Sequence, residues 1–135
     1  MIPVDMTVLH DPPTKIGDCF RCCIASILEL PANKVPHFCG LDPWTDQPDE
    51  RWRNHLLAFL EPMGLYYFEM DFSAEILPEW SKHLELHHTI SGISPRKVRH
   101  TCVGFGGAVV HDPHPSRAGI SPEDGSFLLG FVCKK

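Results

Sequence analysis

The chain is organised around one stretch of sequence, residues 17–31, which reads GDCFRCCIASILELP. Its apolar side chains recur at helical spacing and form a single stripe, made up of Phe20, Cys23, Ile24, Ile27 and Leu28. Pro31 ends the run, because proline disfavours the helical conformation in the residue before it. The stretch therefore predicts an amphipathic helix of about three turns that packs through its apolar face.

Asp18 and Cys19 stand at the expected start of this helix. Asp18 is a favoured N-cap residue. Cys19 then lies where unpaired backbone N–H groups and the helix dipole favour negative charge. Such a setting lowers the pKa of a thiol, so Cys19 is a candidate nucleophile if a base lies nearby. The alternative is that Cys19 is a small buried apolar residue, as free cysteines commonly are.

The composition is that of one globular domain spanning residues 1–135, with 43% hydrophobic and 21% charged residues. The formal net charge of −5 argues against a nucleic-acid-binding surface. No apolar run reaches membrane-spanning length, and the first residues lack the features of a signal peptide. We therefore expect a cytoplasmic protein with no membrane and no nucleic-acid partner. In that compartment the six cysteines are expected to be thiols rather than disulfides.

The rest of the chain predicts a second helix and then an antiparallel sheet. An apolar stripe predicts a helix over about residues 50–62, and a weaker helical pattern over about 73–86 is interrupted by Pro78. Alternating apolar and β-branched residues predict strands over residues 65–72, 88–92, 100–105, 108–112 and 127–132. Helices followed by antiparallel strands favour an α+β fold over an alternating α/β fold.

A hairpin in this sheet supplies candidate partners for the thiol. The runs 100–105 and 108–112 are joined by two glycines, a hairpin signal. If residues 105–107 form a three-residue loop, His100 lies directly opposite Asp112 with both side chains on one face. Directly opposed Cβ atoms are about 5.5 Å apart, close enough for a carboxylate to hold an imidazole. His100 is then the candidate base and Asp112 the group that orients it.

Two alternatives to this pairing stay open. A two-residue Gly-Gly turn would pair Thr101 with Asp112 and place His100 on the other face, although a bulge could change the count. His111 is the rival base, but it neighbours Asp112 in sequence, and strand alternation points the two side chains in opposite directions.

These blocks together resemble the papain-like cysteine peptidase fold, especially its C39-type and NlpC-type branches. The shared features are a cysteine heading an apolar helix, a later histidine opening a strand, and Asp-Pro ending the next strand. More narrowly, the chain resembles a group of small uncharacterised papain-like proteins encoded by bacteriophages and bacteria. The matching blocks are residues 17–31, 35–38, 91–96, 100–103 and 110–116.

The resemblance implies an α+β papain-like domain whose N-terminal helix carries the cysteine and packs on a C-terminal antiparallel sheet. It implies Cys19 as nucleophile, His100 as general base and Asp112 as the orienting group of a cysteine hydrolase, which works through an acyl-enzyme without a cofactor or metal. The substrate would be a peptide or protein amide or isopeptide, and a phage-encoded protein would act in the host cytoplasm. The alternative function is a papain-like binding module or inhibitor that acts on a host factor with little or no turnover.

One expected feature of such enzymes is absent from the sequence. Papain-like enzymes usually carry a Gln or similar donor a few residues before the cysteine, to help bind the oxyanion. Residues 13–18 contain neither Gln nor Asn. Besides the Cys19 backbone N–H, Thr14, Lys15 or another backbone N–H would have to serve.

Other chemistries fit some of the same residues less well. Cys19 and Cys22 form a C-x-x-C pair, but no strand precedes it as a thioredoxin-like dithiol site requires. The same two cysteines with His111 and His114 could bind zinc, but their spacing is irregular for a structural site. We expect Cys22, like Cys23, to be a packing residue.

Two further features have a functional and a structural interpretation. Arg96 could bind an anionic substrate group through its guanidinium, or it could pair with a surface acid. The tryptophans are expected in the core or in a cleft wall rather than as a platform for stacking bases; they are Trp44, Trp52 and Trp80.

Overall fold

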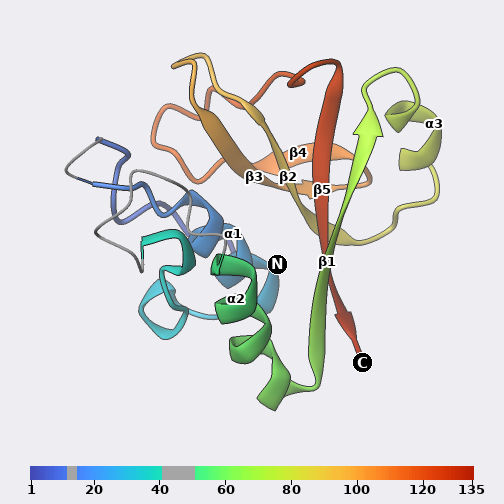
Figure 1. Cartoon of the computed structure of the whole chain (residues 1–135). Helices are drawn as coiled ribbons and strands as arrows, with labels where there is room; N and C mark the ends of the chain where they lie inside the picture. Colours follow the sequence, from blue (N-terminus) through green and yellow to red (C-terminus); the bar gives the residue numbers. More distant parts are fainter. Residues whose placement is uncertain (12–14, 41–50) are drawn as a thin grey trace.

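The computed structural model describes residues 1–11, 15–40 and 51–135 (Figure 1). Trp44 and Thr14 of the sequence predictions lie outside these residues. Helices and an antiparallel sheet together confirm the α+β class. The elements are α1 (Cys19–Leu28), η1 (Ala32–Lys34), η2 (Phe38–Gly40), α2 (Trp52–Leu60), η3 (Glu61–Met63), β1 (Leu65–Ser73), α3 (Leu77–Ser81), β2 (His87–Ile93), β3 (Arg99–Phe105), β4 (Ala108–His111) and β5 (Ser126–Lys134).

The five strands form one sheet in the order β1-β5-β2-β3-β4, with every neighbouring pair antiparallel. β5, which comes after the other strands in the chain, lies between β1 and β2. It pairs with β1 along its whole length, from Leu65 opposite Lys134 to Ser73 opposite Ser126. β4 is short and covers only the turn end of β3. Among the described residues, the other end of β3 therefore has no strand on its outer side.

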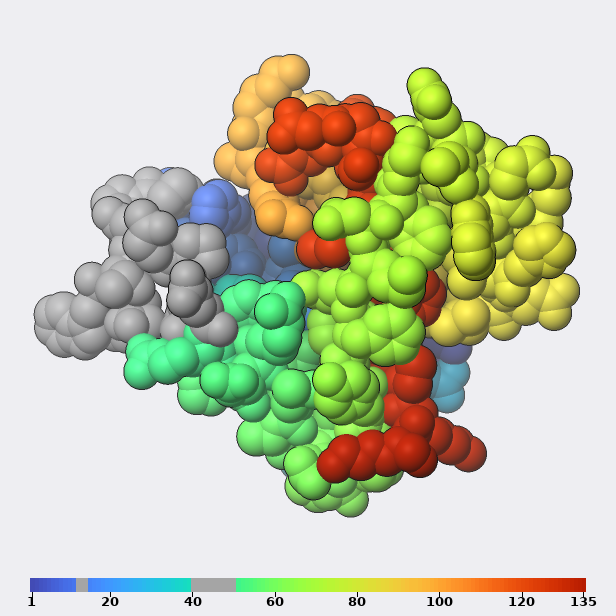
Figure 2. Space-filling view, turned by 45° about the vertical axis from the view of Figure 1, so that its right-hand side comes forward, coloured from blue at the N-terminus to red at the C-terminus, as the bar shows by residue number. Residues whose placement is uncertain are grey.

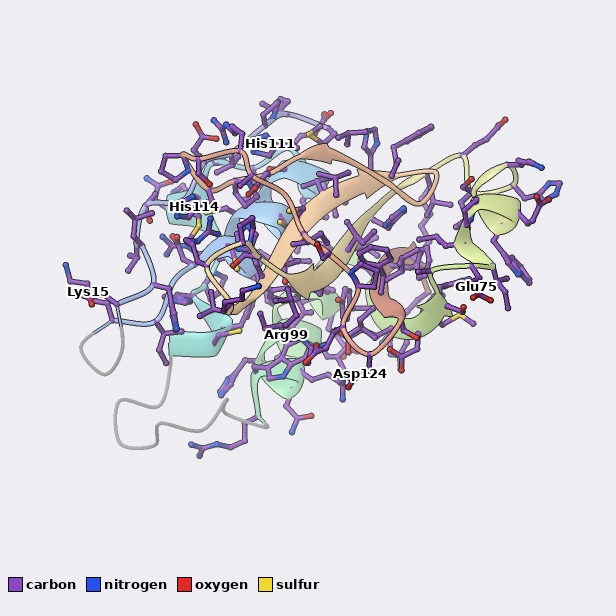
Figure 3. All side chains as sticks on the ribbon, turned by 90° about the horizontal axis from the view of Figure 1, so that it is seen from above. Lys15, Glu75, Arg99, His111, His114 and Asp124 are labelled. Carbon is purple, nitrogen blue, oxygen red and sulfur yellow. The ribbon has the colours of Figure 1, made fainter. Side chains whose placement is uncertain are left out.

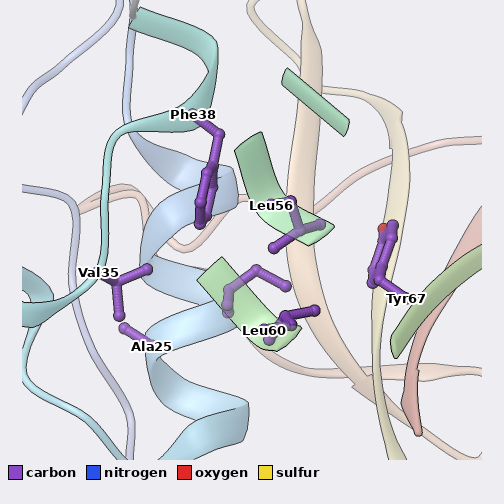
Figure 4. Close-up of a cluster of buried hydrophobic side chains, with 7 residues drawn as sticks. Ala25, Val35, Phe38, Leu56, Leu60 and Tyr67 are labelled. Atoms are coloured by element: carbon purple, nitrogen blue, oxygen red, sulfur yellow. The ribbon is translucent and has the colours of Figure 1, made fainter. Parts of the chain in front are cut away.

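Hydrophobic side chains pack on both faces of this sheet. On one face, α1 and α2 pack against Tyr67 in a cluster that Figure 4 shows, consisting of Ile24, Ala25, Val35, Phe38, Leu56, Leu60 and Tyr67. α2 lies beside β1, as the space-filling view also shows (Figure 2). On the other face, a second cluster includes Leu77 of α3 and consists of Phe72, Leu77, Ile90, Cys102, Leu129 and Phe131. Within the described residues, no helix is long and apolar enough to cross a bilayer.

The predicted helices form, with changes at their ends. α1 buries residues 22–26, as its apolar stripe predicts. α2 begins at Trp52 and continues through the short turn η3 before Gly64, at φ 68°, ends it. The weak helix expected over residues 73–86 is reduced to α3, because Pro78 occupies its first turn, where no backbone N–H is needed. Trp80 of α3 is 54% exposed, so its expected place in the core or cleft wall is wrong.

The hairpin of β3 and β4 differs from prediction in its loop. Phe105 pairs with Ala108, so the loop has two residues, Gly106 and Gly107, with φ values of 58° and 77°. Both angles lie in the left-handed region, which glycine adopts without the steric cost of a Cβ. The predicted three-residue loop is therefore wrong.

A bulge then changes the pairing of the same hairpin. Gly104 pairs with Val109 but Val103 pairs with His111, so Val110 is an extra residue on β4. Inserting one residue reverses the faces of all side chains beyond it. The bulge therefore returns Asp112 to the side of the sheet that carries His100.

Candidate active site

The start of α1 lies against the outer edge of β3, beyond the end of β4. The backbone of Thr101 has no β4 partner there, and a sulfur atom of α1 binds its carbonyl group instead. The thiol of Cys23 donates to the Thr101 carbonyl at 3.3 Å, and the Thr101 N–H faces the sulfur of Cys19. Cys19 is thereby held beside the residue that follows His100.

His100 and Asp112 form a buried pair. The distance from Nε2 of His100 to Oδ1 of Asp112 is 2.7 Å, and each side chain is 4% exposed. Since an ionised carboxylate only accepts, Nε2 carries the proton and donates it to this bond. Nδ1 has no hydrogen-bond partner among the described residues. It is the nitrogen left to accept a proton from a thiol.

The loop after β4 fixes the Asp112 carboxylate. The backbone N–H of His114 donates to Oδ1 at 2.9 Å, and the N–H of Gly119 donates to Oδ2 at 2.8 Å. Although burial raises the pKa of Asp112, the hydrogen bonds from His100, His114 and Gly119 hold that pKa below its ordinary value. Asp112 therefore remains an anion that keeps the ring of His100 in place.

The environment of Cys19 does not lower its pKa as the sequence predicted. Burial raises the pKa of the Cys19 thiol, and the charges of Asp18 and Asp112 act in the same direction. The backbone N–H groups of Thr101 and Phe20 act against this but do not reverse it. The helix start alone therefore does not produce a thiolate, so ionisation of Cys19 requires a nearby proton acceptor.

Asp18 occupies the N-cap position of α1, as predicted, but its side chain does not cap the helix. Its side chain makes no cap bond to α1 and is fully buried. It accepts instead from the backbone N–H groups of Thr7 at 3.1 Å and Val8 at 3.0 Å, and from Arg21 at 2.8 Å. Although burial raises the pKa of Asp18, these bonds hold it below its ordinary value. Asp18 thus fastens the N-terminal segment beside Cys19.

Cys19 and His100 line one cleft of about 610 Å³. Part of its wall is apolar and consists of Met6, Ile16, Phe20, Trp52, Val98 and Leu128. The polar part includes His10, Arg96 and His114. Trp52 is both a cleft wall and a neighbour of the helical core, as predicted. The cleft is large enough for a ligand the size of a short peptide.

The rival base His111 and the zinc candidate Cys22 lie outside the cleft. His111 donates from Nε2 to the Val4 carbonyl at 3.0 Å, against the N-terminal segment (Figure 3). Cys22 is fully buried, and its thiol donates to the Asp5 carbonyl at 3.3 Å. All six cysteines are thiols rather than disulfides, as predicted. The predicted zinc set of two cysteines with His111 and His114 is not brought together.

A different group of metal-ligating atoms does lie close together. One donor atom each of His100, Cys102 and Asp112 falls within 4.8 Å of the others, and all three residues are buried. The carboxylate already accepts from His100 and from two backbone N–H groups. A metal here would have to displace the bond between His100 and Asp112.

His10 is a site residue that the sequence analysis missed. The backbone N–H of Gly17 donates to its Nδ1 at 3.2 Å, so a neutral ring carries its proton on Nε2. His10 lines the cleft together with Gly17 and Cys19. Lys15, proposed from the sequence as a donor, is exposed and does not line the cleft. No local pattern distinguishes His10 from the other histidines, because its place depends on how the segment folds back.

Comparisons with known protein families, with curated proteins and with solved structures find no match to this chain. The functional argument therefore rests on the arrangement of side chains in the cleft.

Proposed function

We propose that this chain is a papain-like cysteine hydrolase that cleaves a peptide, isopeptide or related amide bond. Cys19 is the nucleophile, His100 the general base and acid, and Asp112 the group that orients His100. The observation that carries the proposal is the buried 2.7 Å bond between His100 and Asp112 in the wall of the cleft that also holds Cys19. This combination is the one that nucleophilic catalysis by a thiol requires.

In the first step, Nδ1 of His100 takes the thiol proton as the sulfur of Cys19 attacks the substrate carbonyl carbon. The imidazolium that forms is stabilised by the Asp112 carboxylate, which stays ionised. Because burial raises the pKa of Cys19, we expect the proton to move to His100 during the attack, rather than a stable thiolate to exist beforehand.

The attack creates an oxyanion that needs hydrogen-bond donors. The N–H of Cys19 lies in the first turn of α1, where no intrahelical acceptor exists. Nε2–H of His10 is the candidate second donor, in place of the Gln or Asn that the stretch before Cys19 lacks. Removing one such donor typically slows acyl transfer about 100- to 1,000-fold.

The intermediate then collapses in two stages. The bond from carbon to the leaving nitrogen breaks, that nitrogen takes the proton from His100, and a thioester to Cys19 remains. Water next attacks the thioester while His100 accepts its proton, which releases a carboxylic acid and restores the thiol. This chain's residues supply every proton transfer.

Acylation with p-nitrophenyl acetate tests the proposal without knowledge of the natural substrate. We expect a burst of p-nitrophenol and one acetyl group, located on Cys19 by mass spectrometry. Cys19→Ala should abolish the burst and His100→Ala should slow it strongly, whereas Cys133→Ala, which changes a cysteine outside the cleft, should leave it unchanged. Acetylation of Cys19 no faster than that of a free cysteine would reject the hydrolase.

A binding module or inhibitor with little turnover is the second candidate. The observation that favours it is that burial raises the pKa of Cys19, which opposes a reactive thiol. It predicts ordinary reactivity at Cys19 and biological activity that survives Cys19→Ala. If the chain is phage-encoded, its site of action would be the host cytoplasm.

A further inference from the structure

The cleft carries positive charge although the chain as a whole is acidic. Among the described residues, its wall contains three arginines and one acid, Glu69. Glu69 is already bonded to Arg53 and to the hydroxyl of Tyr67. Nε of Arg99 lies 3.9 Å from Oε2 of Glu123, so this arginine also has a carboxylate beside it. In a chain of net charge −5, this concentration of cations in one cleft indicates an anionic ligand.

Arg96 is the cation of this wall that has no carboxylate partner among the described residues. Its Nη1 donates to the hydroxyl of Ser116 at 3.0 Å. The side chain is exposed and lines the cleft. The sequence analysis left open that Arg96 pairs with a surface acid. Among the described residues, no such ion pair forms. The remaining donors of Arg96 are free for a carboxylate, which a guanidinium binds with two parallel bonds.

Ser116 connects Arg96 to His114, whose ring lies beside the ring of the proposed catalytic residue His100. The backbone N–H of Ser116 donates to Nδ1 of His114 at 3.0 Å, and the Ser116 hydroxyl lies 2.8 Å from the same atom. Nδ1 of His114 is thus an acceptor, so a neutral ring carries its proton on Nε2. Burial and the charge of Arg96 lower the pKa of His114, which favours this neutral form. Its ring meets the ring of His100 edge-on at 6.1 Å.

We propose that Arg96, assisted by Nε2–H of His114, binds a carboxylate on the leaving group of the substrate. The proposal rests on the hydrolase function above. His100 must touch the leaving nitrogen to return its proton, and His114 and Arg96 extend the cleft wall from His100. The departing amine would therefore be a peptide or amino acid with a free carboxylate or an acidic side chain close to the cleaved bond. Figure 3 labels His114 and Arg99 of this wall.

A pair of electrophiles that differ only in charge tests this inference. Bromoacetyl-glycine and bromoacetyl-glycinamide both alkylate thiols, with loss of bromide, but only the first carries a carboxylate. We would measure the ratio of their rates at Cys19, acid over amide, and divide it by the ratio for N-acetylcysteine amide. The normalised ratio should be about tenfold in the wild-type chain, as one charge-assisted hydrogen bond provides.

Matched variants identify the group responsible. Arg96→Gln should bring the normalised ratio close to one, because it removes the guanidinium that favours the acid reagent. Lys97→Gln removes the same charge from the same loop, but Lys97 is exposed and does not line the cleft, so the ratio should persist. A wild-type ratio near one, a ratio unaffected by Arg96→Gln, or an equal loss in Lys97→Gln would overturn the inference.

The same reagents separate this inference from the proposed function. Loss of the amide-reagent rate in His100→Ala reports on the base, whereas the ratio reports on the anion site. A chain whose Cys19 shows ordinary reactivity but keeps an Arg96-dependent ratio would retain the anion site and lose the hydrolase. The opposite result would retain the hydrolase and overturn the anion site.

Discussion

Replacing Asp112 by Asn tests the charge of the orienting group with little change in shape. In the wild-type chain, Oδ1 accepts from His100 and from the N–H of His114, and Oδ2 accepts from the N–H of Gly119. Asn offers one oxygen and one NH2 group. An NH2 at the Oδ2 position faces the N–H of Gly119. At the Oδ1 position the NH2 group faces the N–H of His114, so two donors meet. It also requires His100 to accept a hydrogen bond on Nε2.

Both orientations of the introduced amide weaken His100 as a base, because the charge that stabilises its imidazolium is gone. The second also moves the ring proton to Nδ1, which then cannot accept the proton of Cys19. A hydrogen bond to a charged group is worth about 1.5–3 kcal/mol, which corresponds to about a tenfold to hundredfold loss in rate. One buried donor is also left unpaired, so the free energy of unfolding should fall by about 1–3 kcal/mol.

Iodoacetamide alkylation of Cys19 at pH 7, followed by mass spectrometry, measures the first effect, and urea unfolding measures the second. Because the pKa of Asp112 lies below its ordinary value of 3.8, the wild-type chain binds fewer protons folded than unfolded near that pH. Stability from Asp112 is thus present above pH 3.8 and is lost as the pH falls through the lower folded value. The stability difference between wild type and Asp112→Asn should shrink over the same range.

The control is Asp71→Asn, which removes one negative charge from an exposed position of β1. It should leave both the alkylation rate and its pH dependence unchanged. Cys19 of Asp112→Asn could instead be alkylated at the wild-type rate with the wild-type pH profile. In that case Asp112 does not support a base, and the roles proposed for Asp112 and His100 are wrong.

Three further changes test other parts of the structure. His10→Ala should slow acylation by p-nitrophenyl acetate about 100-fold but leave iodoacetamide alkylation of Cys19 unchanged, since alkylation forms no oxyanion; equal rates of acylation would exclude His10 as a donor. Gly104→Ala places a Cβ in steric conflict with Cε1 of the buried His88 ring, so urea unfolding should show a loss of about 1–3 kcal/mol, and wild-type stability would contradict the packing. Burial lowers the pKa of His88 from its ordinary value of 6.5. The stability contributed by the neutral His88 ring is therefore present above pH 6.5 and is lost as the pH falls below 6.5. The loss is at most about 1.36 kcal/mol per pH unit. His88→Gln should flatten this slope in urea unfolding and the exposed His83→Gln should not; a slope that persists in His88→Gln would assign it to another group.

The sequence predicts those parts of the fold that depend on local pattern. The apolar stripe after Cys19 and the glycines of the hairpin each specify an element through the conformation of a few neighbouring residues. The pairing of His100 with Asp112 is also correct, but by a different route. The loop is shorter than predicted, and the bulge at Val110 compensates for it. Val110 is an exposed valine that follows another exposed valine, Val109, so nothing in the local pattern marks it as the extra residue.

Features that depend on distant segments are those that the sequence could not supply. Aspartate is a residue type that commonly caps helices, yet the carboxylate of Asp18 accepts hydrogen bonds from the N–H groups of Thr7 and Val8, which lie in an irregular segment. Its burial therefore depends on the path of that segment, which no periodicity encodes. The pKa of Cys19 follows the same rule, because burial in the folded chain raises it, and the charge of the distant residue Asp112 acts in the same direction.

The position of β5 has a consequence for how the protein is made. β1 and β2 have no contact within the sheet except through β5, which follows both in the chain. On the ribosome, which adds about 5–20 residues per second, Cys19 emerges well before His100 and Asp112, and the strand that joins the two parts of the sheet emerges after all of them. The nascent chain therefore carries Cys19 for several seconds before His100 and Asp112, and the proposed active site can form only once the sheet has closed around its last strand.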